Sequence, residues 1–167
     1  HTNCEDKVST IMGRFNRKGV TKILFAETIA STSYMPTLVE VTGAEDYTKA
    51  IAAVDGFSIE NQEIETPDMD STFVSKIPGD DSAADSSLTF YEDDVTDDIE
   101  TDLAKGTTGF ILIARKGKAA GTKGLDVYPV RVASTSATIT ADNEAAKITT
   151  RFSITDRPLL NATIPAT

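Results

Sequence analysis

Carboxylates are the reactive side chains that this sequence supplies in the greatest number. Six of them lie between Asp93 and Asp102, and Asp80, Asp81 and Asp85 form a second group. A calcium-binding EF-hand needs the pattern D-x-[DN]-x-[DN]-G with a later glutamate, and the first group lacks both the glycine and the spacing. We interpret the first group as the start of a solvated helix and the second as a polar loop. Weak Ca²⁺ binding is the alternative for each.

The residue types that most often act in catalysis are scarce. His1 is the only histidine and Cys4 the only cysteine, so neither an internal imidazole base nor a histidine-activated thiol is available. The basic loop at 116–124 lacks the G-x-x-x-x-G-K-[ST] spacing of a phosphate-binding loop. A carboxylate pair that only folding brings together, as in glycoside hydrolases, stays open as a remote alternative. The sequence predicts no enzyme, no cofactor, and no catalytic or metal-binding residues.

The length and net charge of the chain limit its number of domains and its possible partners. The chain has 167 residues, which suits one domain, and a net charge of −10. We expect an N-terminal arm at 1–20 and a single domain at 21–167. The charge argues against binding nucleic acid by neutralising phosphates, but a negative wall that repels phosphate suits a surface past which DNA slides. No apolar run approaches the roughly 20 residues of a membrane helix, so no membrane partner is expected.

Two short helices are expected beside a β-rich body. The stretch 42–56 combines a capping box, Thr42 with Glu45, with apolar residues at helical spacing and a glycine at its end. The stretch 97–104 follows Thr96, which can cap it, and has aspartates in its first turn, where the helix dipole favours negative charge.

Most of the remaining chain has the pattern of β-strands. Apolar residues that alternate or run continuously predict strands at 21–27, 57–66, 86–92, 107–117, 125–141 and 147–158. The 107–117 segment is apolar on both faces, as in a central strand, and Leu88 and Phe90 are expected to point inward. The strands come in hairpin-like pairs without βαβ alternation. This order predicts a mainly antiparallel β-sandwich or barrel with one or two short flanking helices.

One connection between strands is unusually long and contains large apolar residues. It spans about 60–86, which exceeds the roughly 12–15 residues beyond which a loop is usually functional or disordered. Its apolar residues are Met69, Phe73, Val74 and Ile77. They either pack back on the parent core or become ordered against another copy of the chain.

Two stretches carry a resemblance to a known family. Residues 53–94 read AVDGFSIENQEIETPDMDSTFVSKIPGDDSAADSSLTFYEDD, and residues 151–166 read RFSITDRPLLNATIPA. A threonine- and acid-rich segment, a phrase like IPG and a strand like SLTFYED resemble the middle of major tail proteins, the tail tube subunits of long-tailed bacteriophages. The second stretch resembles their final strand and tail. The resemblance covers about 35–166.

The resemblance implies a fold and a structural role. It implies a β-sandwich or barrel that assembles as hexameric rings, stacked into a tube that holds the tape-measure protein and conducts DNA without sequence-specific binding. The implied location is the virion, after assembly in the bacterial host cytoplasm, with tail terminator or tip proteins as further partners. The loop at 60–86 would bridge to the next ring, with Met69, Phe73, Val74 and Ile77 at a subunit interface. A β-sandwich binding or adhesion module with Ca²⁺ clusters is the alternative.

Overall fold

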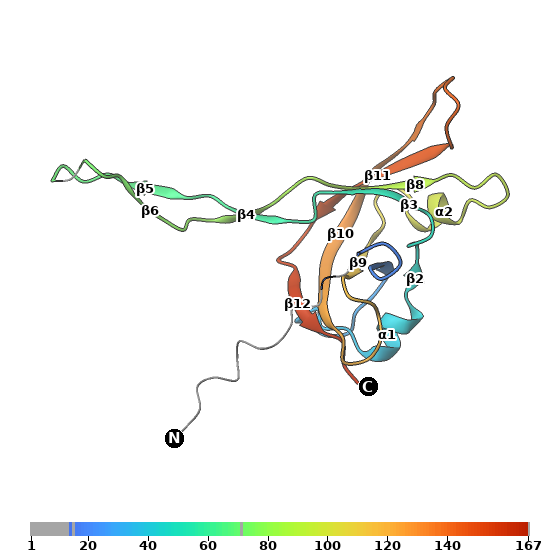
Figure 1. Cartoon of the computed structure of the whole chain (residues 1–167), viewed down its shortest axis with the longest axis horizontal. Coiled ribbons are helices and arrows are strands. Elements are labelled where there is room, and N and C mark those ends of the chain that lie inside the picture. The colour runs from blue at the N-terminus through green and yellow to red at the C-terminus, as the bar shows by residue number, and fades with distance from the viewer. Residues whose placement is uncertain (1–13, 15, 71, 167) are drawn as a thin grey trace.

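The fold is a long antiparallel sheet that bends around its own core (Figure 1). The structure is a computed structural model that describes residues 14, 16–70 and 72–166. Its helices are α1 (Leu38–Gly43) and α2 (Asp98–Asp102). Its strands are β1 (Lys22–Ala26), β2 (Glu45–Asp46), β3 (Ile51–Asp55), β4 (Ile59–Asn61), β5 (Ile64–Thr66), β6 (Ser75–Ile77), β7 (Asp81–Ala83), β8 (Ser86–Tyr91), β9 (Thr108–Ala114), β10 (Lys123–Thr138), β11 (Lys147–Ile154) and β12 (Leu159–Thr163).

The main sheet has the strand order β2-β1-β9-β10-β11-β8-β3, and β12 pairs with β10 beside this path. β10 organises it by changing partners: its first half pairs with β9 and β12, and its second half with β11. Pro129, which has no backbone N–H, lies between the end of the β12 ladder and the start of the β11 ladder. A bulge between Val132 and Ser134 follows, and bulges bend strands. The sheet folds over on itself, but it is not a closed barrel.

Two clusters of buried side chains hold the fold together. The first lies inside the bend and joins both halves of the sheet; it contains Ile23, Phe25, Tyr47, Phe57, Leu88, Phe90, Leu103, Ile111, Tyr128, Val130, Val132 and Phe152. The second lies on the other face of β1 and β9, and contains Leu24, Ala26, Val41, Leu112, Ala114, Leu125, Val127 and Ile164. β9 is therefore buried on both faces, which confirms the central position predicted for 107–117.

The helix predicted at 42–56 is wrong. A capping box does form, but five residues earlier, where Thr37 and Glu40 cap α1. Beyond Gly43 the chain enters β2, turns at residues 48–50 and enters β3, because pairing with β1 and β8 outweighs local helical spacing. The sequence repeats the T-x-x-E signature, and spacing alone does not tell which copy is used.

The strand predicted at 57–66 is divided into β4 and β5, and Phe57 before them has a positive φ. The remaining predicted elements are in place, with shifted ends. The helix at 97–104 is present as α2, but Asp97 rather than Thr96 is its N-cap. The strands at 21–27, 86–92, 107–117, 125–141 and 147–158 correspond to β1, β8, β9, β10 and β11. Leu88 and Phe90 are buried, as expected. Most of the predicted N-terminal arm, residues 1–13 and 15, lies outside the described residues.

Candidate assembly interface

The segment predicted as a long loop is a two-stranded arm. It leaves the body after β3, returns into β8, and contains two short antiparallel ladders, β4 with β7 and β5 with β6. Figure 1 shows it extending far beyond the body, away from the free end of the β10–β11 hairpin. At about 3.3 Å per residue, some 11 residues on each side give a reach of roughly 35 Å. A two-stranded hairpin is marginally stable alone, so a surface that covers this arm would stabilise it.

Pro78 and Gly79 separate the two ladders of the arm. Pro78 cannot donate a ladder hydrogen bond, and a Cβ at Gly79 would lie 2.0 Å from the carbonyl oxygen of Gln62. Asn61 bridges the gap, because its side-chain amide donates to the Gly79 carbonyl at 2.9 Å and its Oδ1 accepts from the Gly79 N–H at 3.1 Å. The phrase IPG is thus the point at which the two backbones of the arm come into contact.

Met69, Phe73, Val74 and Ile77 lie on the outer half of the arm. Their exposed fractions are 105%, 76%, 46% and 50%, and none belongs to either core cluster. Ile77 is opposite Ile64, which is also half exposed, across the β5–β6 ladder. Of the two alternatives drawn from the sequence, packing on the parent core is therefore wrong, and contact with another copy stays a prediction.

The arm leaves the body through two consecutive residues with positive φ. Gly56 has φ 79° and Phe57 has φ 55°, a region that costs a non-glycine residue roughly 1–2 kcal/mol. The Phe57 N–H donates to Ser86 Oγ at 3.0 Å, and its carbonyl accepts from the Tyr128 hydroxyl at 2.5 Å. A Cβ at Gly56 would lie 2.1 Å from the Asp85 carbonyl oxygen, so only glycine fits. These contacts fix the direction in which the arm leaves the body.

The aromatic part of this anchor is buried. The Phe57 ring packs edge-on against the Tyr128 ring, with centroids 5.3 Å apart, and tilted against Phe152 at 6.2 Å. Burial, and then the charge of Asp126, raise the pKa of Tyr128 to about 12. The Tyr128 hydroxyl therefore stays protonated at neutral pH and keeps its hydrogen bond to Phe57.

A second set of contacts joins the arm to the corner between β11 and β12. The Arg157 guanidinium pairs with the Asp81 carboxylate on β7, and the Tyr34 hydroxyl donates to the adjacent Asp156. The hydrogen bond from Tyr34 holds the pKa of Asp156 below its ordinary value. Surface contacts of this kind add little stability, but they hold the arm at a point separate from Phe57.

Beside the arm, the main sheet consists of four strands, β3, β8, β11 and the second half of β10. This four-stranded part has two open edges. Within the described residues, β3 pairs only with β8, and residues 134–138 of β10 pair only with β11. The two edges read IAAVD and STSAT, and Asp55 is their only charged residue. Edge strands are usually protected by lysine, proline or inward-pointing charge. Apart from Asp55, these two edges instead present unpaired backbone groups with uncharged side chains.

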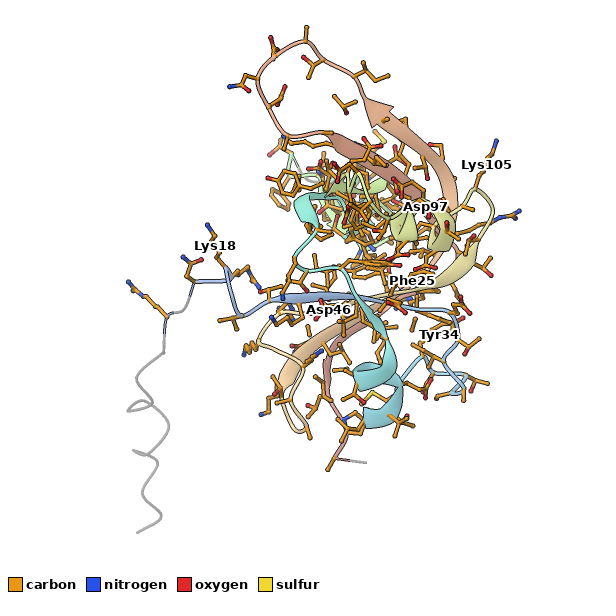
Figure 2. The ribbon with its side chains drawn as sticks, turned by 90° about the vertical axis from the view of Figure 1, so that its right-hand side faces the viewer. Lys18, Phe25, Tyr34, Asp46, Asp97 and Lys105 are labelled. Carbon is orange, nitrogen blue, oxygen red and sulfur yellow. The ribbon has the colours of Figure 1, made fainter. Side chains whose placement is uncertain are left out.

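Acidic side chains are concentrated in α2 and the loop before it, although Lys105 lies on the same side of the body as Asp97 (Figure 2). Figure 2 shows Lys18, before β1, and Asp97, before α2, at opposite sides. Asp102 accepts a hydrogen bond from the Tyr47 hydroxyl at 3.1 Å, and burial followed by Asp102 raises the pKa of Tyr47 well above its usual range. Over residues 14, 16–70 and 72–166, the structure contains no cluster of three His, Cys, Asp or Glu side chains suited to a metal.

The basic loop after β9 is held by acidic neighbours. Arg115 Nε lies 3.1 Å from Asp126 Oδ2, and the Lys118 ammonium lies 3.6 Å from Asp46 Oδ2. Arg115 also donates to the Asn161 side chain at 3.0 Å. The loop therefore anchors the ends of β10 and β12 instead of gathering free cations around an anion site.

Comparison with known families decides the class of protein. The family model described as phage tail tube protein matches residues 8–167. The chain belongs to the phage tail tube protein family. The resemblance drawn from the sequence is confirmed. The protein is accordingly a structural component of the phage virion and not an enzyme. No curated protein matches its sequence.

Solved tail and injection-system structures share the fold. A chain in the structure of the PVC sheath/tube terminator, from an extracellular contractile injection system, matches with a TM-score of 0.63 at 14% identity, covering 91% of this chain and 100% of that one. A chain of the PVC sheath–tube complex matches at 0.58 and 14% identity, covering 93% and 94%. The tail tube of phage SPP1 matches at 0.54 and 16% identity, covering 91% and 81%.

Several residues of the candidate interface were not predicted from the sequence. The length and residue types of the 60–86 connection indicated this segment and its apolar residues, but nothing in the sequence indicated the anchor at Phe57 or the open edges of β3 and β10. Gly56 did leave a signal in the sequence, because it was expected to end the helix predicted at 42–56. Neither helix of the described chain is long and apolar enough to cross a membrane.

The anchor predicts that alanine is tolerated much less at Gly56 than at Gly121. Both glycines have nearly the same positive φ, 79° and 77°, but a Cβ added at Gly121 would have no atom within 4 Å, so Gly121→Ala carries the backbone cost alone. We expect Gly121→Ala to lower the free energy of unfolding by about 1 kcal/mol. Gly56→Ala should lose about 1–3 kcal/mol more, because it also clashes with Asp85.

Urea unfolding of the two variants, followed by circular dichroism, measures this difference. Equal losses in the two variants would contradict a sterically closed arm root.

Proposed function

We propose that this chain is the tail tube subunit that polymerises as stacked hexameric rings into a hollow tube. The tube would hold the tape-measure protein during assembly in the host cytoplasm and later conduct viral DNA. Tail terminator and tip proteins would close its two ends. The observation that carries the proposal is the pair of open edges on opposite sides of one sheet, which contain neither lysine nor proline and have Asp55 as their only charged residue.

The first step of the proposed assembly is edge pairing within a ring. The β3 edge of one copy would pair with the 134–138 edge of β10 in the next, so that each sheet continues into its neighbour. Such a contact joins two different patches, and a heterologous contact closes into a ring when its rotation permits. Pairing would satisfy the open backbone groups of both strands, which favours assembly.

The second step sets which face of the sheet lines the channel. The rest of the domain, including both core clusters, lies on one side of the four-stranded sheet. When such sheets join edge to edge into a cylinder, the bulky side needs the larger circumference and lies outside. The opposite face, which carries the residues next to the buried ones in β8 and β11, would then face the lumen.

The third step is the contact between rings. The arm begins where β3 ends and β8 starts, whereas the free end of the β10–β11 hairpin lies at the other end of the same strands. The arm therefore projects along the strand direction, and Figure 1 shows arm and hairpin at opposite ends of the molecule. Its apolar tip would be covered by a copy in the adjacent ring. Met69, Phe73, Val74 and Ile77 are the proposed interface residues.

Edge pairing predicts disulfide cross-links between neighbouring copies. In a Cys4→Ser background, Ala53→Cys on β3 is combined with Ser134→Cys, Ser136→Cys or Thr138→Cys on β10. Paired strands bring opposite Cβ atoms to about 4–5.5 Å, close to the spacing that a disulfide needs. We expect one combination, oxidised in the polymer, to give a ladder of bands that ends at six subunits. Each single-cysteine variant serves as a control and should give no ladder.

A ladder that ends at another number would contradict the hexamer. No ladder in any of the three combinations, in preparations that do contain polymer, would contradict edge pairing.

The proposed contact of the arm with the adjacent ring predicts that charged substitutions at its apolar tip prevent polymerisation. Phe73→Asp combined with Ile77→Asp should leave the monomer folded, because both side chains are at least half exposed. The double variant should form at least tenfold less sedimentable polymer, since two carboxylates cannot be buried in an apolar contact without a large cost. Val39→Asp, which changes an apolar residue exposed on α1, is the matched control and should polymerise normally. An unchanged polymer yield in the double variant would contradict this interface.

A further inference from the structure

The ladder registers identify the residues on the outward face of the β3–β8–β11–β10 sheet. Leu88, Phe90, Ile148 and Phe152 are buried, so their neighbours along the strands point away from the core. Residues that lie opposite each other in the ladders share this face. The rows across the strands are Asp55–Ser87–Arg151–Ser134, then Ala53–Thr89–Thr149–Ser136, then Tyr91–Lys147–Thr138, with Arg131 opposite Ser153 beyond them.

The charge of this face differs in sign from the charge of the chain. The rows contain one carboxylate, on Asp55, and three cations, on Arg131, Lys147 and Arg151, which gives a net charge of +2. The whole chain carries −10. Much of the acidic charge lies elsewhere, at residues 92–102 in α2 and the loop before it. The net charge of the chain therefore does not describe this face.

Two arginines on this face have no acidic partner in the described part of the chain. Arg131 and Arg151 are exposed, and no carboxylate there lies within ion-pair distance of either one; Lys147, in contrast, lies 3.7 Å from Glu144. Arg151 precedes Ser153, the partner of Arg131, by two residues, so the two arginines are diagonal neighbours at roughly 7–8 Å. Neighbouring guanidinium groups repel each other, and an anion placed between them would remove that repulsion.

The surroundings of the arginines favour a sugar–phosphate backbone over a protein partner. The rows are otherwise rich in serine and threonine hydroxyls, which with arginine are common donors to phosphate oxygens. The core of a protein–protein interface is usually rich in apolar and aromatic residues. Tyr91, at one end of the rows, is the only large apolar or aromatic residue among them.

We propose that this face contacts the phosphate backbone of nucleic acid, with Arg131 and Arg151 as the phosphate-binding residues. The inference rests on the proposed function, in which the same face lines the channel. Two phosphate contacts per subunit carry no sequence information, and they are few enough to be weak and sensitive to salt. Repeated around a ring, they would guide DNA along the wall instead of repelling it.

Nuclear magnetic resonance titration of the monomeric protein tests this contact. A 12-base-pair DNA duplex is added at low salt, at a protein concentration where light scattering shows monomer. We expect amide shifts confined to residues near Arg131, Ser134, Arg151 and Ser153. Doubling the salt concentration should weaken binding about 3.5-fold, which corresponds to two phosphate contacts at a slope of about −0.9 each.

Matched variants locate the contact. Arg131→Gln with Arg151→Gln should abolish the shifts, whereas Lys116→Gln with Lys123→Gln removes the same charge from the β9–β10 loop and the first residue of β10 and should leave them unchanged. Shifts at that loop instead, or no shifts at millimolar DNA, would overturn the inference. Equal shifts with poly-glutamate would overturn the assignment to nucleic acid. If the DNA contact is absent while cross-linked rings form, this inference fails and the proposed function stands.

Discussion

The need to pair backbone N–H and C=O groups is the constraint that links the fold of this protein to its proposed assembly. A strand edge leaves N–H and C=O groups without partners, and soluble proteins usually shield such edges. Here the four-stranded part of the sheet ends in β3 on one side and in the second half of β10 on the other, and neither edge is shielded by lysine or proline. A second copy of the chain offers each edge the partner that fits it. Both core clusters are formed within one chain, whereas the ladders at these two edges lack a neighbour, which the proposed assembly supplies.

The same strand connects the core to the assembly edge. The first half of β10 is buried between β9 and β12, and its second half runs past Pro129 and the bulge into an exposed hairpin with β11. The arm has a comparable design, with a buried anchor at Phe57 and an exposed apolar tip. In both cases the rigid core sets the direction of an element whose outer part is free to meet another copy. The fixed root matters because an arm of roughly 35 Å turns a small error of angle into a large error at its tip.

The sequence predicted the β-rich class well and the arrangement less well. Strands with clear apolar patterns, such as 107–117 with residues buried on both faces, were predicted because burial leaves a direct signature in residue type. The helix at 42–56 failed because Ile51, although at helical spacing from Tyr47, also suits a strand and pairs with β8 as part of β3. Tyr47 lies between β2 and β3 and donates its backbone N–H to the Ile23 carbonyl on β1. The length of the 60–86 connection and its four apolar residues marked this segment, and the family resemblance predicted that it bridges to another ring. The anchor between Phe57, Ser86 and Tyr128 could not be predicted, since these residues are far apart in the chain and meet only in the folded sheet. For the same reason the net charge of −10 did not predict that the outward face of the β3–β8–β11–β10 sheet carries a charge of +2.

Electron cryomicroscopy of the concentrated protein, with helical reconstruction of any tubes, tests the central claim most directly. The account predicts hollow tubes of stacked rings in which β3 of each subunit is hydrogen-bonded to residues 134–138 of β10 in its neighbour, forming one continuous inner sheet. Tubes in which these two edges stay uncovered, or subunits that meet only through other surfaces, would contradict it.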